Sequence, residues 1–156
     1  MRWLTAVLLA TAPCGASPDV APSDATHQLE QAQRLWEHAA PHAYSYSVKY
    51  SAFVLEFGCE VQRYRVSGSR STPLAASSCK SRPDVLGSVP ALFGLIHKLL
   101  RDGYKHIDMS FDGVLGYPKS VYVGNDEFAD DYFAFEISGF SSNGQDAPPN
   151  NRWRGP

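Results

Sequence analysis

The segment from Tyr104 to Val123 has the pattern of a β-hairpin, and it constrains the fold more than any other stretch of the chain. Its apolar residues alternate with polar ones, as in a strand that buries one face. These apolar residues are Ile107, Met109, Phe111, Val121 and Val123. Glycines and a proline lie between the two alternating runs and favour a turn. We therefore predict two antiparallel strands over a hydrophobic core.

Two segments have the spacing of amphipathic helices. The first runs from Ala25 to Ala39, with Asp24 or Thr26 as its candidate N-cap. Its predicted apolar face contains Leu29, Ala32, Leu35, Trp36 and Ala39. The second begins after a candidate N-cap, Ser88, and ends before Gly103. Its predicted apolar face contains Leu92, Phe93, Ile96, Leu99 and Leu100.

Three strands are expected between the helices. Residues 44–54 alternate tyrosine and valine with serine and lysine, and this is the clearest strand pattern in the chain. A second strand is expected over Cys59–Val66, with a bulge near Gln62 where the apolar positions change face. A third is expected over Ser71–Ala76. It contains Pro73 and is therefore confined to a sheet edge.

A last strand over Phe133–Ile137 completes the order α-βββ-α-βββ. Short connections favour antiparallel pairing, and two amphipathic helices can bury their apolar stripes on one face of a shared sheet. We expect an α+β fold, with two helices on one face of an antiparallel sheet of five to six strands. The domain should span residues 24–140, between a flexible lead-in at 17–23 and a disordered tail at 141–156.

The N-terminus has the layout of a secretory signal peptide, residues 1–16. A basic residue precedes an apolar run, and small residues then favour cleavage after Ala16. The alternative is a lipid anchor at Cys14, which is disfavoured because Pro13 stands where a small residue is expected. After cleavage, Cys59 and Cys79 would remain, and an oxidising compartment favours a structural disulfide between them. We expect a periplasmic or secreted protein.

Charge and hydropathy argue against two classes of partner. The net charge is −2 and no predicted element carries a basic stripe, which argues against nucleic acid. After the N-terminal segment, no apolar run reaches the roughly 18 residues of a membrane-spanning helix. The expected partner is a protein or small ligand of the cell envelope.

The chain contains Leu35-Trp36, Tyr44-Ser45-Tyr46, Leu92-Phe93 with Ile96, and Phe111-Asp112 with Gly116-Tyr117-Pro118. This pattern, from about Arg34 to Ser138, resembles domain of unknown function 6174, a family of small exported bacterial proteins that include many lipoproteins. Phe111 replaces a tyrosine that is commoner there, and Cys59 stands where members often have two closely spaced cysteines. The resemblance implies this fold class and an exported protein, and it implies no activity.

Two sets of residues are candidates for recognising a partner. The first is the hairpin turn, with Asp112, Gly116, Tyr117 and Pro118. The second is the aromatic set Tyr44, Tyr46 and Tyr50. These tyrosines would form a binding surface if their strand exposed them, and they would belong to the core if they faced the helices.

An enzymatic site has weaker support. His106, Asp108 and Ser110 share one face of a strand, but alternate strand residues lie about 6.6 Å apart, too far for a hydrogen-bonded catalytic chain. The acidic loop 125–131 could gather a metal ion or meet a basic partner, although a solvated loop is the simpler explanation. We predict no catalytic residue, no cofactor and no metal ligand.

Three functions are consistent with these features. The favoured one is a non-enzymatic, exported binding or envelope-associated module. The first alternative is an exported hydrolase or metal-dependent enzyme that uses His106, Asp108 and the acidic loop. The second is a protein inhibitor or assembly factor that presents an edge strand or the hairpin tip to another protein.

Overall fold

In the computed structural model of the chain, the backbone is described over residues 22–52, 61–74, 86–125 and 128–142. Side chains are described over residues 24–51, 61–74, 86–125 and 132–142. The helices are α1 (Pro22–Ala39) and α2 (Val89–Arg101). The strands are β1 (Ala43–Ala52), β2 (Gln62–Ser67), β3 (Arg70–Pro73), β4 (His106–Phe111), β5 (Pro118–Asn125) and β6 (Phe128–Ser141). The order is α-βββ-α-βββ, which confirms the predicted α+β fold.

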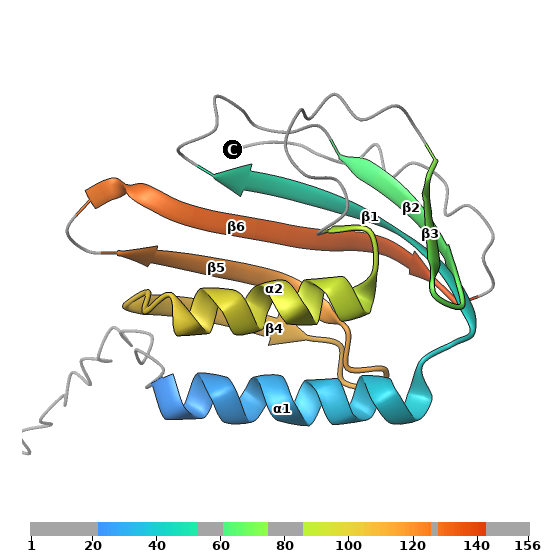
Figure 1. Ribbon diagram of the computed structural model, residues 1–156, viewed down its shortest axis with the longest axis horizontal. Helices are drawn as coiled ribbons and strands as arrows, with labels where there is room; N and C mark the ends of the chain where they lie inside the picture. Colours follow the sequence, from blue (N-terminus) through green and yellow to red (C-terminus); the bar gives the residue numbers. More distant parts are fainter. Residues whose placement is uncertain (1–21, 53–60, 75–85, 126–127, 143–156) are drawn as a thin grey trace, which may run out of the picture.

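Within the described residues, the strands form one antiparallel sheet in the order β3-β2-β1-β6-β5-β4. One half of the sheet consists of β1, β2 and β3, and the other consists of β4, β5 and β6. Within each half, strands that are neighbours in sequence pair with each other. The two halves join where β1 pairs with β6. The last strand therefore lies in the middle of the sheet (Figure 1). β3 lies at an edge and contains Pro73, as predicted.

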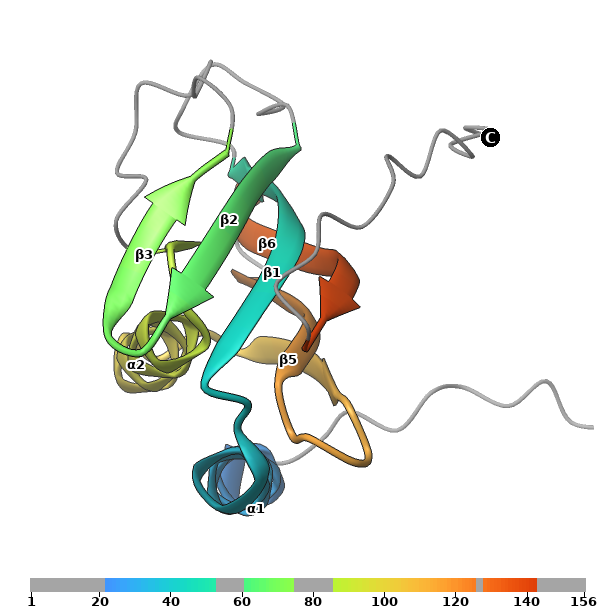
Figure 2. The ribbon, with the colours of Figure 1, turned by 90° about the vertical axis from the view of Figure 1, so that its right-hand side faces the viewer.

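Both helices lie on the same face of the sheet, as Figures 1 and 2 show. The N-cap predicted for α2 is confirmed, because the Ser88 Oγ accepts a hydrogen bond of 3.3 Å from the backbone N–H of Ala91. The start predicted for α1 is wrong. This helix begins at Pro22, so Asp24 and Thr26 lie inside it and neither is its N-cap. Proline suits the first turn of a helix because an N–H there would have no partner within the helix.

The inner face of the sheet carries the tyrosines of β1 toward the helices. Tyr44 and Tyr46 are only 3% and 2% exposed, so of the two alternatives left open by the sequence both belong to the core, and neither forms a binding surface. Their hydroxyls bind the segment that enters α2, where the Val89 N–H donates to the Tyr44 Oη (3.1 Å) and the Tyr46 Oη donates to the Leu86 carbonyl. Burial raises the pKa of both phenols. Tyr50 is half-buried and packs against the same core.

The hairpin predicted over Tyr104–Val123 also contributes its apolar face to this core. Ile107, Met109 and Phe111 pack against the buried cluster, and Val121 and Val123 are themselves buried. The remaining buried residues of the cluster include Leu29, Ala32, Trp36, Val89, Leu92, Phe93, Ile96 and Leu99 from the helices. The predicted burial of this hairpin face is therefore confirmed.

Two details of the strands differ from the prediction. The β1–β2 register is regular from Gln62 to Ser67, so the predicted bulge near Gln62 is wrong. A register shift is found instead in β6, where Gly139 has a φ of 61°. β6 also begins at Phe128, so much of the predicted acidic loop 125–131 has the backbone of a strand. In the β5–β6 register Tyr132 pairs with Gly124 and Phe128 with Asn125, so Asp130 and Asp131 lie at a register shift between these two pairs.

Several predictions fall on residues that the structure does not describe. They concern the signal peptide with Cys14, the disulfide between Cys59 and Cys79, and the C-terminal tail beyond residue 142. These stay predictions.

Candidate functional site

The β4–β5 connection is the turn that was predicted to recognise a partner, and Asp112 organises it. The Asp112 Oδ1 accepts hydrogen bonds from the backbone N–H groups of Val114 (3.0 Å) and Leu115 (2.8 Å). The Asp112 N–H donates to the Tyr117 carbonyl, and the Asp112 carbonyl accepts from the Gly116 N–H, each at 2.9 Å. The turn is therefore closed through both the side chain and the backbone of one residue.

The turn also docks on α1. Gly116 is buried, with a φ of 79°, and a Cβ there would lie 2.2 Å from the Ala32 carbonyl oxygen. Glycine is required at this position because it alone combines a positive φ with so close an approach. Leu35 borders the contact and is 39% exposed, so it lies at the margin of the buried helix face and not within it as predicted.

The end of the turn packs into the core. The Tyr117 ring stacks on Phe140, with ring centroids 4.2 Å apart and planes 10° apart, and Pro118 is fully buried. Partial burial raises the pKa of the Tyr117 phenol, and the nearby Asp112 carboxylate adds to this rise. These contacts give the turn a role in folding, and its role in recognition stays a prediction.

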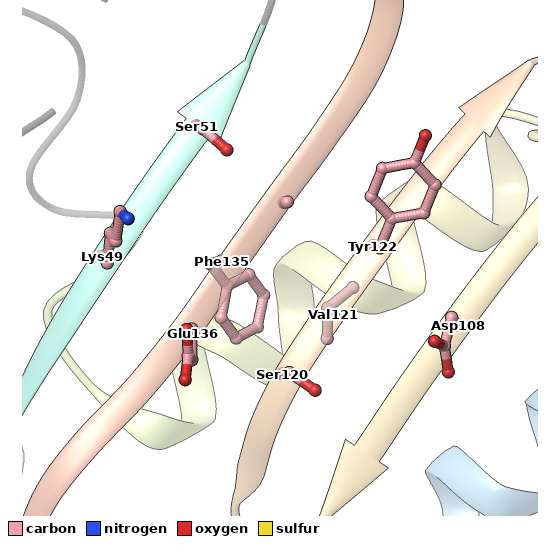
Figure 3. A pocket seen from close by; sticks show the side chains of 9 residues that line it. Lys49, Ser51, Asp108, Ser120, Val121, Tyr122, Phe135 and Glu136 are labelled. Carbon is pink, nitrogen blue, oxygen red and sulfur yellow. The ribbon is translucent and has the colours of Figure 1, made fainter. Parts of the chain in front are cut away.

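The outer face of the sheet, opposite the helices, carries an open depression of about 250 Å³. Figure 3 looks onto this face, with α2 behind the strands. Its lining includes the polar residues Lys49, Ser51, Asp108, Ser120 and Glu136 and the exposed aromatic residue Tyr122. The register brings them together from four strands, because Glu136 is paired with both Lys49 and Ser120, and Asp108 is paired with Tyr122.

Tyr122 is the exposed aromatic residue of this depression. Its side chain is 47% exposed, and its ring stacks on that of Tyr132 with centroids 6.2 Å apart and planes 19° apart. A Cβ at Gly124 would lie 3.1 Å from the Tyr122 Oη, so the ring extends over the glycine. Figure 3 shows the ring nearly face-on, beside β5.

A family of unknown function (DUF6174) matches residues 28–142, which include most of α1, all of α2, the docked turn and every residue of the depression. The chain belongs to this family. It has no match among curated proteins or solved structures.

Several residues of the pattern noted in the sequence occupy packing positions. Trp36 contacts Tyr44 edge to face, with centroids 5.2 Å apart, and Tyr44 stacks on Phe140 at 5.5 Å. Phe140 in turn stacks on Tyr117 of the turn. These contacts join α1, β1, the turn and β6 in one aromatic cluster, so the pattern describes how the domain closes.

Two residues of the catalytic set that the sequence raised, Ser110 and Asp108, lie on the outer face of the sheet in this DUF6174 domain. Ser110 shares a hydrogen bond with Ser120, with 2.6 Å between their Oγ atoms, and Asp108 is exposed. Among the described side chains, no group of three or more histidine, cysteine, aspartate or glutamate residues could hold a metal ion. Likewise, none of the described helices is long and apolar enough to cross a membrane.

Sequence reasoning missed the residues that surround the depression, apart from Asp108. The sequence does contain one sign of them. Tyr122 lies between Val121 and Val123, so a strand that buries both valines must direct this tyrosine to the opposite face. Lys49 and Glu136 could not be matched from sequence because their pairing depends on the β1–β6 contact.

Proposed function

We propose that this DUF6174 domain is an exported, non-enzymatic binding module that holds its ligand on the outer face of the sheet. The observation that carries the proposal is the one-sided packing of the described residues, in which both helices lie on the inner face and the depression lies on the other face. Export is supported by the signal-like N-terminal sequence.

The side chains of the depression suit binding. Lys49 supplies hydrogen-bond donors, Asp108 and Glu136 supply acceptors, and Tyr122 adds an exposed aromatic ring. A few polar groups around an aromatic side chain are typical of ligand sites in proteins. This surface is therefore the proposed binding surface, in place of the tyrosines of β1 that are buried.

Two of the side chains that line the depression are carboxylates. Asp108 and Glu136 lie two strands apart and two residues apart along the strand direction, which places their Cα atoms about 12 Å from each other. Two acceptors spaced in this way can contact different parts of one ligand.

Binding to fractions of the cell envelope tests the proposal. The purified domain would be incubated separately with cell-wall glycan, membranes and soluble envelope proteins from the source cells. Two folded variants separate the candidate surfaces, namely Glu136→Lys in the depression and Val114→Asp at the hairpin tip, where Val114 is 77% exposed. We expect retention by one fraction, lost in Glu136→Lys and kept in Val114→Asp. Retention by no fraction, or loss only at the tip, would contradict the proposal.

Export is tested separately by N-terminal sequencing of the protein from those cells. We expect a mature N-terminus at Ser17, after cleavage following Ala16. An unprocessed N-terminus at Met1 would contradict export through this segment.

A further inference from the structure

We propose that Tyr122 is a stacking platform for one pyranose ring of a neutral oligosaccharide, held at the depression on the outer face. This inference rests on the proposed binding function and names its ligand class. Sugar rings offer an apolar C–H face edged by hydroxyl groups, so they match an aromatic ring that has hydrogen-bonding groups at its margin.

The orientation of the Tyr122 ring is the first observation. An exposed tyrosine on a strand could project into solvent, but this ring extends along β5 over Gly124, where a Cβ would lie only 3.1 Å from the hydroxyl. The missing side chain of Gly124 therefore gives the ring room to lie flat. The Tyr122 side chain is 47% exposed, which leaves part of the ring surface accessible to a ligand.

The second observation is that the ring is held in place. Tyr132 of the neighbouring strand stacks on Tyr122 at a centroid distance of 6.2 Å. Such contacts between aromatic side chains are worth about 0.5–1.5 kcal/mol beyond burial. Because the ring is already oriented by Gly124 and Tyr132, a ligand would lose little affinity to ordering it.

The third observation is the polar margin. Asp108 lies directly across from Tyr122 in the register, and Ser120 and Glu136 lie in the next row of the same face. Lys49 stands opposite Glu136, so the margin offers both donors and acceptors, as hydroxyl groups require.

The charge and the volume of the depression further restrict the class of ligand that it can bind. One lysine against two carboxylates leaves this margin slightly negative, which disfavours anionic ligands. Its volume of about 250 Å³ falls below the range of about 300–1,000 Å³ of sites for drug-sized molecules. One sugar unit at a time fits such a site, with the rest of the chain extending along the open sheet.

The test is calorimetric titration of the full mature domain with cellohexaose, chitohexaose and maltohexaose, together with saturation-transfer NMR of the bound sugar. We expect binding of at least one hexasaccharide, with saturation strongest at ring C–H protons. Tyr122→Leu keeps an apolar cover over Gly124 but removes the aromatic face, and should weaken binding at least tenfold. Tyr122→Phe keeps the face and should bind within threefold of the wild type.

Different outcomes separate this inference from the proposed function. If no hexasaccharide binds, or if Tyr122→Leu binds as tightly as Tyr122→Phe, the sugar platform is wrong. Suppose instead that an envelope protein binds, that Glu136→Lys abolishes this binding, and that no hexasaccharide binds. The outer face is then still a binding surface, and only the proposed class of ligand is wrong. If neither binds, both proposals fail. Matching thermal melting curves would show that the variants are folded.

Discussion

Gly116 in the hairpin turn lies against the Ala32 carbonyl of α1, so close that a Cβ at position 116 would approach this oxygen to 2.2 Å. The first helix and the central hairpin are far apart in sequence, and this contact fixes how they meet. The backbone of α1 cannot yield without disturbing its own hydrogen bonds. Altering this contact should therefore lower the free energy of unfolding by a measurable amount.

Gly116→Ala should lower the free energy of unfolding by roughly 3–5 kcal/mol, because a strained φ of 79° adds to the clash with α1. Gly113→Ala is the matched control in the same turn, where a Cβ would meet nothing within 4 Å. That variant should stay within about 0.5 kcal/mol of the wild type. Urea unfolding of the three proteins measures both values, and equal losses would show that the contact is not as close as described.

Asp112→Ala should destabilise the domain by about 1–2 kcal/mol, because the N–H groups of Val114 and Leu115 lose their acceptor. Asp112→Asn keeps a side-chain oxygen in that position and should cost less than half as much. Thermal and urea unfolding give the difference. Similar losses in both variants would mean that the carboxylate charge, and not the hydrogen bonds, stabilises the turn.

Gly124→Ala should behave unlike Gly116→Ala, although both glycines are buried. The new Cβ would meet the tip of the Tyr122 side chain, and displacing this ring costs at most its contact with Tyr132, whereas the Ala32 carbonyl belongs to the backbone of α1. We expect a change in stability of less than about 1 kcal/mol, together with a shift of the Tyr122 ring resonances in NMR spectra. A loss as large as that of Gly116→Ala would show that Tyr122 is rigidly held by other contacts.

Alkaline pH should unfold the domain through its buried tyrosines. Burial raises the pKa of Tyr46 far above its usual value, and the neighbouring Tyr44 and Tyr64 add to the rise. In the unfolded chain the phenol ionises near pH 10, so the stability that neutral Tyr46 provides is complete below about pH 10 and is lost as the pH rises further.

Tyr46→Phe removes this ionisation. Above pH 10, the free energy of unfolding of this variant should fall less steeply with pH than that of the wild type. The two slopes should differ by about 1.4 kcal/mol per pH unit. Between pH 7 and 9 the variant should instead be weaker by a constant amount of about 1–2 kcal/mol, because the Leu86 carbonyl loses its donor. Urea unfolding at a series of pH values checks both. Parallel curves above pH 10 would contradict the assignment.

Local patterns were enough to predict most of the elements. Helix α2 follows from Ser88 and the apolar spacing after it, and the β4–β5 hairpin follows from Ile107, Met109 and Phe111, because side-chain periodicity reports directly which face is buried. The start of α1 and the start of β6 were less predictable. Both depend on residues with weak or mixed propensity, where pairing and packing decide the boundary.

The candidate site was much less predictable than the fold. The sequence pointed to the tyrosines of β1, and the helices cover Tyr44 and Tyr46. It also pointed to His106 and Asp108, of which only Asp108 lines the depression. Tyr122 and Glu136 were not selected, since each is an ordinary outward-facing strand residue until the neighbouring strand is known.

The spacing of residues close together in the chain is enough to predict two amphipathic helices, a set of strands with one apolar face, and a turn rich in glycine and proline. The position of β6 between β1 and β5, which brings Lys49 beside Glu136 and Tyr132 beside Tyr122, emerges from the three-dimensional packing alone. The reason is that such pairing is selected by the fit of the whole hydrophobic face against the helices, and no local pattern encodes which distant strand provides that fit.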